Sequence, residues 1–86
     1  MPTESQLRET ALRQRIRELI ENGRLPVIVP AQLNAGYGSG SICAACGEPI
    51  TRSQVEYEVE DSASDTRLRF HVSCHLVWQL VTASRA

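Results

Sequence analysis

Three cysteines and two histidines fall into two short clusters of the 86-residue chain. One cluster reads Cys43-Ala44-Ala45-Cys46-Gly47, and the other reads His71-Val72-Ser73-Cys74-His75. Zinc takes four thiolate or imidazole donors in a tetrahedron, and proteins usually supply them as two close pairs. Twenty-four residues separate Cys46 from His71, which is enough for one β-hairpin. The spacing predicts a structural zinc site, one Zn²⁺ per chain, with the ligands Cys43, Cys46, His71 and Cys74.

The second cluster offers two histidines for one ligand position. His71 and Cys74 are three residues apart and can converge on one side of a helical turn. Cys74 and His75 are adjacent and point about 100° apart on a helix, which makes joint ligation difficult. We therefore expect His75 to be an exposed or partly packed side chain, and it stays the alternative to His71.

Other interpretations of the cysteines compete with a metal site. A Cys-x-x-Cys pair also occurs in thioredoxin-like redox proteins, but it then follows a strand of a βαβ unit, and no such unit is evident here. The cysteines can instead be unrelated small core residues. A thiol redox or zinc sensor is a further alternative, because thiolates release their metal on oxidation.

An enzyme is not expected from this ligand set. Four protein ligands close a zinc site, whereas a catalytic site keeps one position open. The zinc deaminase layout, in which His-x-Glu precedes Pro-Cys-x-x-Cys, is absent. Glu48 is the only acid near the first cluster and is read as an exposed turn residue. The glycines at 36, 38 and 40 lack the lysine and the strand–helix context of a phosphate-binding loop.

An amphipathic helix is predicted for residues 1–23. Thr3 followed by Gln6 has the form of a capping box, and Asn22-Gly23 is typical of a helix end. Between them, apolar residues recur at spacings of three and four and predict one buried stripe: Leu7, Ala11, Leu12, Ile16, Leu19 and Ile20.

The rest of the chain divides into a linker, residues 24–42, and a zinc-binding module, residues 43–86. Prolines close both ends of 25–30, which is expected to be extended or a short edge strand, and 36–41 is expected to be flexible. Alternation over 55–60 and 67–70 predicts an antiparallel hairpin whose outward Glu and Arg residues meet. A final helix is predicted over 72–83, with Ser73 as its cap and with core-facing Val77, Trp78, Leu80 and Val81. The fold class is therefore α+β.

This arrangement resembles a treble-clef zinc finger, which has a knuckle with two ligands, a β-hairpin and a helix carrying the rest. Cys43, Cys46, His71 and Cys74 match the first zinc module of a LIM domain, although the interval is longer and no second module follows. The resemblance covers residues 43–83, and the wider layout also resembles small uncharacterised bacterial proteins. It implies a non-catalytic binding module, since such fingers mostly recognise proteins or nucleic acids.

Composition narrows the class of partner. The net charge is −1, and all nine basic residues are arginines. A domain that binds nucleic acid mainly through phosphates usually carries a basic excess. A protein partner is therefore preferred, and the alternative is a nucleic-acid-binding or transcription-associated finger that uses Arg8, Arg13, Arg15 and Arg17.

The sequence also bears on location and assembly. No apolar run approaches the roughly 20 residues of a membrane span, and the first 17 residues do not have the pattern of a secretory signal. We expect a cytoplasmic protein without membrane contact. Its first helix can form a homodimer if its apolar stripe exceeds what one finger covers. At 86 residues with 5% aromatics, the chain has a small core for which zinc would compensate.

Overall fold

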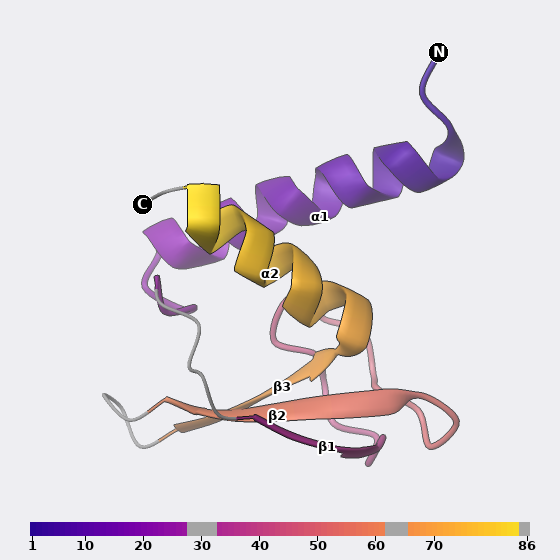
Figure 1. Cartoon of the computed structure of the whole chain (residues 1–86), viewed down its shortest axis with the longest axis vertical. Coiled ribbons are helices and arrows are strands. Elements are labelled where there is room, and N and C mark those ends of the chain that lie inside the picture. The colour runs from indigo at the N-terminus through magenta and orange to yellow at the C-terminus, as the bar shows by residue number, and fades with distance from the viewer. Residues whose placement is uncertain (28–32, 62–65, 85–86) are drawn as a thin grey trace.

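A computed structural model describes residues 1–27, 33–61 and 66–84. The elements run in the order α1 (Glu4–Glu21), β1 (Leu33–Tyr37), β2 (Val55–Asp61), β3 (Thr66–His71) and α2 (Val72–Ser84). Both helices lie on the same side of the three-stranded sheet, and α2 lies between α1 and the sheet (Figure 1). The α+β class expected from the sequence is confirmed.

The ends of α1 match the sequence prediction. The Thr3 side chain accepts a hydrogen bond from the Gln6 backbone N–H, and the Gln6 side chain accepts one from the Thr3 N–H. At the other end, the Asn22 N–H bonds to the Glu18 carbonyl, and Gly23 has a φ of 75°. Glycine adopts this left-handed conformation without steric cost, so the helix stops where the sequence indicated.

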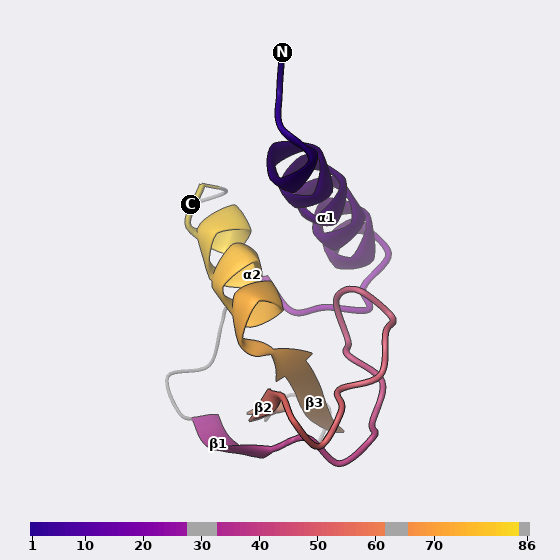
Figure 2. The same cartoon turned by 90° about the vertical axis from the view of Figure 1, so that its right-hand side faces the viewer.

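Only the second half of α1 is buried, which corrects the prediction of one continuous stripe. Ile16 and Ile20 belong to the core, but Leu7 is 57% exposed and Ala11 is also exposed. The α-helix turns about 100° per residue, so Leu7 lies half a turn around the helix from Ile16. The two side chains cannot share a face, and the first half of α1 projects beyond the rest of the molecule (Figures 1 and 2).

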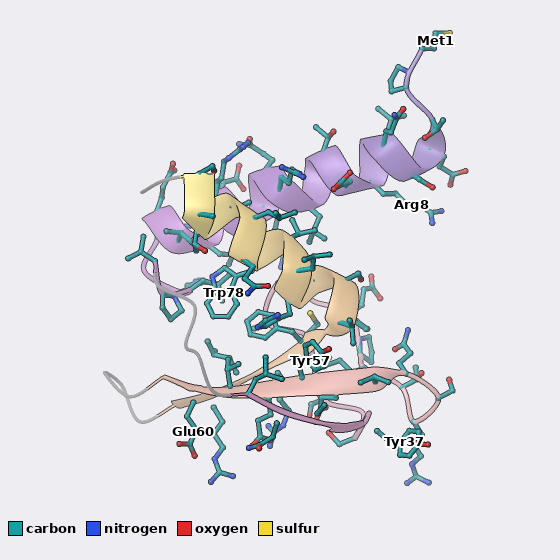
Figure 3. The ribbon with its side chains drawn as sticks, in the orientation of Figure 1. Met1, Arg8, Tyr37, Tyr57, Glu60 and Trp78 are labelled. Atoms are coloured by element: carbon teal, nitrogen blue, oxygen red, sulfur yellow. The ribbon has the colours of Figure 1, made fainter. Side chains whose placement is uncertain are left out.

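The sheet is antiparallel with the order β1-β2-β3, and it contains the predicted hairpin. Tyr57 pairs with Phe70 on the face toward α2, whereas Glu60 points away from the helices (Figure 3). On that outer face the Arg67 and Arg69 guanidinium groups lie 3.3–3.7 Å from glutamate carboxylates, as the alternation predicted. The register thus separates an apolar face from a charged one.

The strand β1 lies in the segment that was expected to be a linker, residues 24–42, and it overlaps the part of that linker, 36–41, that was expected to be flexible. It pairs with β2 along its whole length, and the pairing continues past it, where the Gly38 N–H bonds to the Gln54 carbonyl at 2.8 Å. A Cβ atom at Gly38 would overlap the Thr51 carbonyl oxygen, so glycine permits this close approach. Gly38 therefore serves tight backbone pairing. The expected extended segment at 25–30 lies mostly outside the described residues.

Helix α2 supplies the centre of the core. Trp78 is fully buried, its ring stacks on Phe70 with centroids 4.7 Å apart, and its Nε1–H donates to the Pro26 carbonyl at 3.2 Å. Val77 and Val81 are buried beside it, as predicted. The face of α2 that carries Val77, Trp78 and Val81 packs between α1 and the sheet. This packing explains why a short chain can enclose a core.

Three details of α2 differ from the sequence prediction. The helix begins at Val72, so Ser73 lies inside its first turn and does not cap it. Leu80 is 44% exposed, because it lies on the opposite side of α2 from the buried residues. His75, expected to be exposed or partly packed, is buried with 4% of its surface accessible.

Among the residues that the structure describes, no helix is both long enough and apolar enough to cross a membrane.

Candidate metal centre

The first pair of candidate ligands lies at the tip of an irregular hairpin, in the turn of residues 43–47, which we call the knuckle. The Cys43 N–H bonds to the Glu48 carbonyl and the Gly47 N–H to the Cys43 carbonyl, at 2.9 and 3.0 Å. Gly47 has a φ of 78°, which a side chain would disfavour. These bonds fix the tight turn that brings Cys43 and Cys46 to the same side.

The second pair lies at the junction of β3 and α2. His71 is the last residue of β3, and Cys74 lies in the first turn of α2, so no loop separates the two elements. The Ala44 N–H of the knuckle bonds to the Arg69 carbonyl of β3 at 2.8 Å. This bond holds the knuckle beside the end of β3, two residues before His71.

The structure brings together all four residues that the spacing singled out. One side-chain atom from each of Cys43, Cys46, His71 and Cys74 lies within 4.8 Å of the other three, so this group could hold a metal ion. His71 Nδ1 is 3.4 Å from the Cys46 sulfur and 3.9 Å from the Cys74 sulfur. In tetrahedral zinc sites, bonds of about 2.3 Å to sulfur and 2.0 Å to nitrogen place the donor atoms about 3.5–3.8 Å apart. The two distances from His71 are close to this spacing, and the four-residue group could hold one metal ion.

The orientation of the His71 ring is fixed by contacts that the sequence did not reveal. Its Nε2 atom lies 3.2 Å from both the Pro49 carbonyl oxygen and the Gln54 Oε1 atom. Both are acceptors, so Nε2 carries the proton and Nδ1 presents its lone pair to the cysteines. Second partners of this kind commonly orient metal-binding histidines.

Arg15, which the sequence analysis considered only as a nucleic-acid contact, links α1 to the knuckle. Its Nε–H donates to the Ala45 carbonyl at 2.7 Å. A Cβ atom at Gly47 would come within 3.1 Å of the same guanidinium group, so the arginine lies closely over the turn. A metal site with three thiolates carries net negative charge, and this cation would partly balance it.

The three thiols have different affinities for protons. A hydrogen bond donated by the Cys74 thiol, aided by nearby backbone N–H groups, lowers the pKa of Cys43 to about 4. The same bond, followed by burial, raises the pKa of Cys74, and burial raises that of Cys46. In this folded arrangement Cys43 is therefore the thiol that ionises most readily, whereas Cys46 and Cys74 hold their protons more firmly. A divalent metal bound by all three sulfurs would displace the protons that remain.

His75 lies apart from the four-residue group. Its ring is packed edge-on against Tyr57 at 5.2 Å between centroids, with Trp78 at 5.8 Å and Phe70 at 5.9 Å. Burial lowers its pKa, and its Nε2 atom has no hydrogen-bond partner among the described residues. The neutral ring therefore belongs to the aromatic core, and the geometry favours His71 as the histidine of the cluster.

Comparison with known proteins adds no assignment to this geometry. No protein-family model matches the chain, and neither the curated proteins nor the solved structures include a significant match.

Proposed function

We propose that the chain is a small non-catalytic zinc domain in which one Zn²⁺ holds the fold together. The observation that carries the proposal is the convergence of three cysteines and one histidine within 4.8 Å, with Cys43 and Cys74 buried. Thiolate and imidazole donors favour zinc over magnesium or calcium, which prefer oxygen ligands. Because the pairs come from the knuckle and from the β3–α2 junction, the ion would connect both ends of the hairpin.

The same donor set supports a structural role for the ion. Four protein donors fill a tetrahedron and leave no position for water or substrate. A general acid or base would have to lie beside the metal, and the His71 ring is already held by Pro49 and Gln54. The knuckle, hairpin and following helix also agree with a treble-clef-like arrangement, of which the LIM zinc module is one form.

We propose that this domain acts in protein–protein interaction. Its arginines are largely engaged within the molecule, which weakens the nucleic-acid alternative. Arg8 and Arg13 pair with Glu4 and Glu9 one turn earlier along α1, and Arg15 bonds to the knuckle. Arg17, the fourth arginine of that alternative, is exposed and has no such partner among the described residues. A phosphate-binding surface needs a basic excess, and three of these four arginines already have a partner within the molecule. Exposed apolar side chains on α2 and the sheet offer a surface better suited to protein contact.

Cobalt substitution tests the metal assignment. Co²⁺ added to the reduced, metal-free chain should give the intense visible and near-ultraviolet bands of a tetrahedral site with three thiolates. Zn²⁺ should remove those bands at one equivalent. Octahedral cobalt spectra, or no bands at all, would exclude the proposed site.

Fluorescence anisotropy with random duplex DNA at low salt tests the alternative, because salt-sensitive binding would favour nucleic acid over protein.

A further inference from the structure

The outward side of α2 carries an exposed apolar ridge. Val72, Leu76 and Leu80 are 40%, 53% and 44% exposed, and their spacing of four residues places them along one line of the helix. On the sheet face below, Leu33 and Val55 are 38% and 45% exposed. We call these five residues, together with Ala35 between Leu33 and Tyr37 on β1, the α2–β1 surface.

The α2–β1 surface lies on the side of the molecule away from α1. In the view of Figure 2, α1 lies to one side of α2, and β1 extends to the other side. An open cleft of about 540 Å³ lies where the α2 ridge meets the sheet, and it is lined by Gln54, Val55, His71, Val72, Ser73 and Leu76. The surface therefore combines an apolar floor and one helical wall.

β1 is also an unprotected sheet edge. The bond from Gly38 to Gln54 sets the alternation of the ladder, so the N–H and C=O groups of Leu33, Ala35 and Tyr37 point away from β2. None of the described residues pairs with that side of β1. Natural edge strands are usually blocked by charge or proline, and the sequence Leu-Asn-Ala-Gly-Tyr contains neither.

Edge geometry and charge favour a second copy of the chain as the occupant. The outward N–H and C=O groups of Leu33, Ala35 and Tyr37 form an antiparallel edge that is complementary to itself about a two-fold axis. β1 and α2 contain no charged residue, so two identical surfaces can meet without like-charge repulsion.

We propose that two copies pair antiparallel through their β1 edges about a two-fold axis. The product is a six-stranded sheet with both α2 helices on one face. The floor residues Leu33, Ala35 and Val55 of both copies then lie between the two α2 ridges and become buried. This inference rests on the proposed protein-binding role and names the partner, and it uses β1 rather than α1 as the contact.

Sedimentation equilibrium of the zinc-loaded chain tests the dimer with two variants. Ala35→Pro removes an outward N–H in each copy, and Leu33→Lys places a charge on the apolar floor. Each should raise the dimer dissociation constant about tenfold or more. Asn34→Thr is the matched control, because it leaves β1 uncharged and its side chain lies on the opposite sheet face, and it should change the constant less than about threefold.

Metal content and Trp78 fluorescence in the same samples separate the possible failures. A folded, zinc-loaded wild-type chain that stays monomeric at its highest soluble concentration would overturn the dimer and leave the zinc domain intact. A dimer that is unaffected by both variants would overturn the β1 contact. Absence of bound zinc from the wild type would count against the proposed function, whatever the oligomeric state.

Discussion

The Arg15 Nε–H donates to the Ala45 carbonyl across 30 residues of sequence, at 2.7 Å. This bond joins the N-terminal helix to the knuckle that carries Cys43 and Cys46. Helix α1 is therefore a structural part of the candidate metal centre and does more than precede it in the chain.

Substituting Arg15 should weaken both the fold and the site. Arg15→Ala removes a charged hydrogen bond and should lower the free energy of unfolding by about 1–2 kcal/mol. It should also weaken metal binding, because a cation beside an anionic centre is lost. Chemical denaturation and competition with a chromophoric chelator measure the two effects. Arg17→Ala on the exposed side of α1 is the control and should change stability by less than about 0.5 kcal/mol. Equal effects of the two substitutions would contradict the linking role.

Loss of one cysteine should unfold the module. Structural zinc supplies about 10–16 kcal/mol of apparent binding free energy, which is comparable to or larger than the roughly 5–15 kcal/mol net stability of a domain. Cys46→Ser should therefore abolish the cooperative unfolding transition, and chelation of the wild type should do the same. Circular dichroism and Trp78 fluorescence measure this unfolding transition. Ser73→Ala, at an exposed position beside Cys74, should unfold like the wild type. A native spectrum of reduced, metal-free protein would refute the role of the ion.

The two histidines should respond in opposite ways. His71→Ala removes a ligand and should reduce bound zinc well below one ion per chain. His75→Leu should retain one ion and change the free energy of unfolding by less than about 1.5 kcal/mol, since removing an unpartnered buried nitrogen offsets the lost ring contacts. Metal analysis after gel filtration distinguishes the variants. Loss of zinc from His75→Leu with retention in His71→Ala would reverse the ligand assignment.

Metal affinity should rise steeply with pH. In the folded arrangement, burial raises the pKa of Cys46 and the hydrogen bond to Cys43 raises that of Cys74, so both thiols hold their protons at pH 7. The same bond lowers the pKa of Cys43 to about 4, but it is lost when the metal-free chain unfolds, and Cys43 then also starts as a protonated thiol. Metal binding therefore releases two protons from a folded metal-free chain or three from an unfolded one, and the apparent affinity should increase about 100-fold or about 1,000-fold per pH unit near pH 7. Competition titrations at several pH values measure the slope. A slope near zero would mean that the thiols are already ionised.

The sequence contained enough to predict the four donors and the hairpin, because both depend on short spacings. The Cys-x-x-Cys and His-x-x-Cys pairs are local, and the alternation around Tyr57 and Phe70 has the period of a strand. The signals that predicted the ends of α1 were equally local, since Thr3 and Gly23 each act within one turn of the helix. These features need no knowledge of distant contacts.

What the sequence could not supply was long-range pairing. The strand β1 contains Gly36, which pairs with Glu56, a residue 20 positions later in the chain. No local pattern in the sequence therefore marks β1 as a strand. The Arg15–Ala45 bond and the Gln54 contact to His71 likewise exist only after the chain folds. The burial of His75 was not predicted, because its position next to Cys74 in the sequence does not reveal that Tyr57, Phe70 and Trp78 surround its ring. Tertiary packing decided each of these points.

Native mass spectrometry of protein purified without chelator is the most direct test of the central claim. The mass of the folded chain should exceed that of the apo polypeptide by one zinc ion less the protons it displaces. Denaturing conditions should return the bare polypeptide mass. A folded chain that carries no metal after growth in zinc-replete medium, and takes up none on addition, would contradict the account.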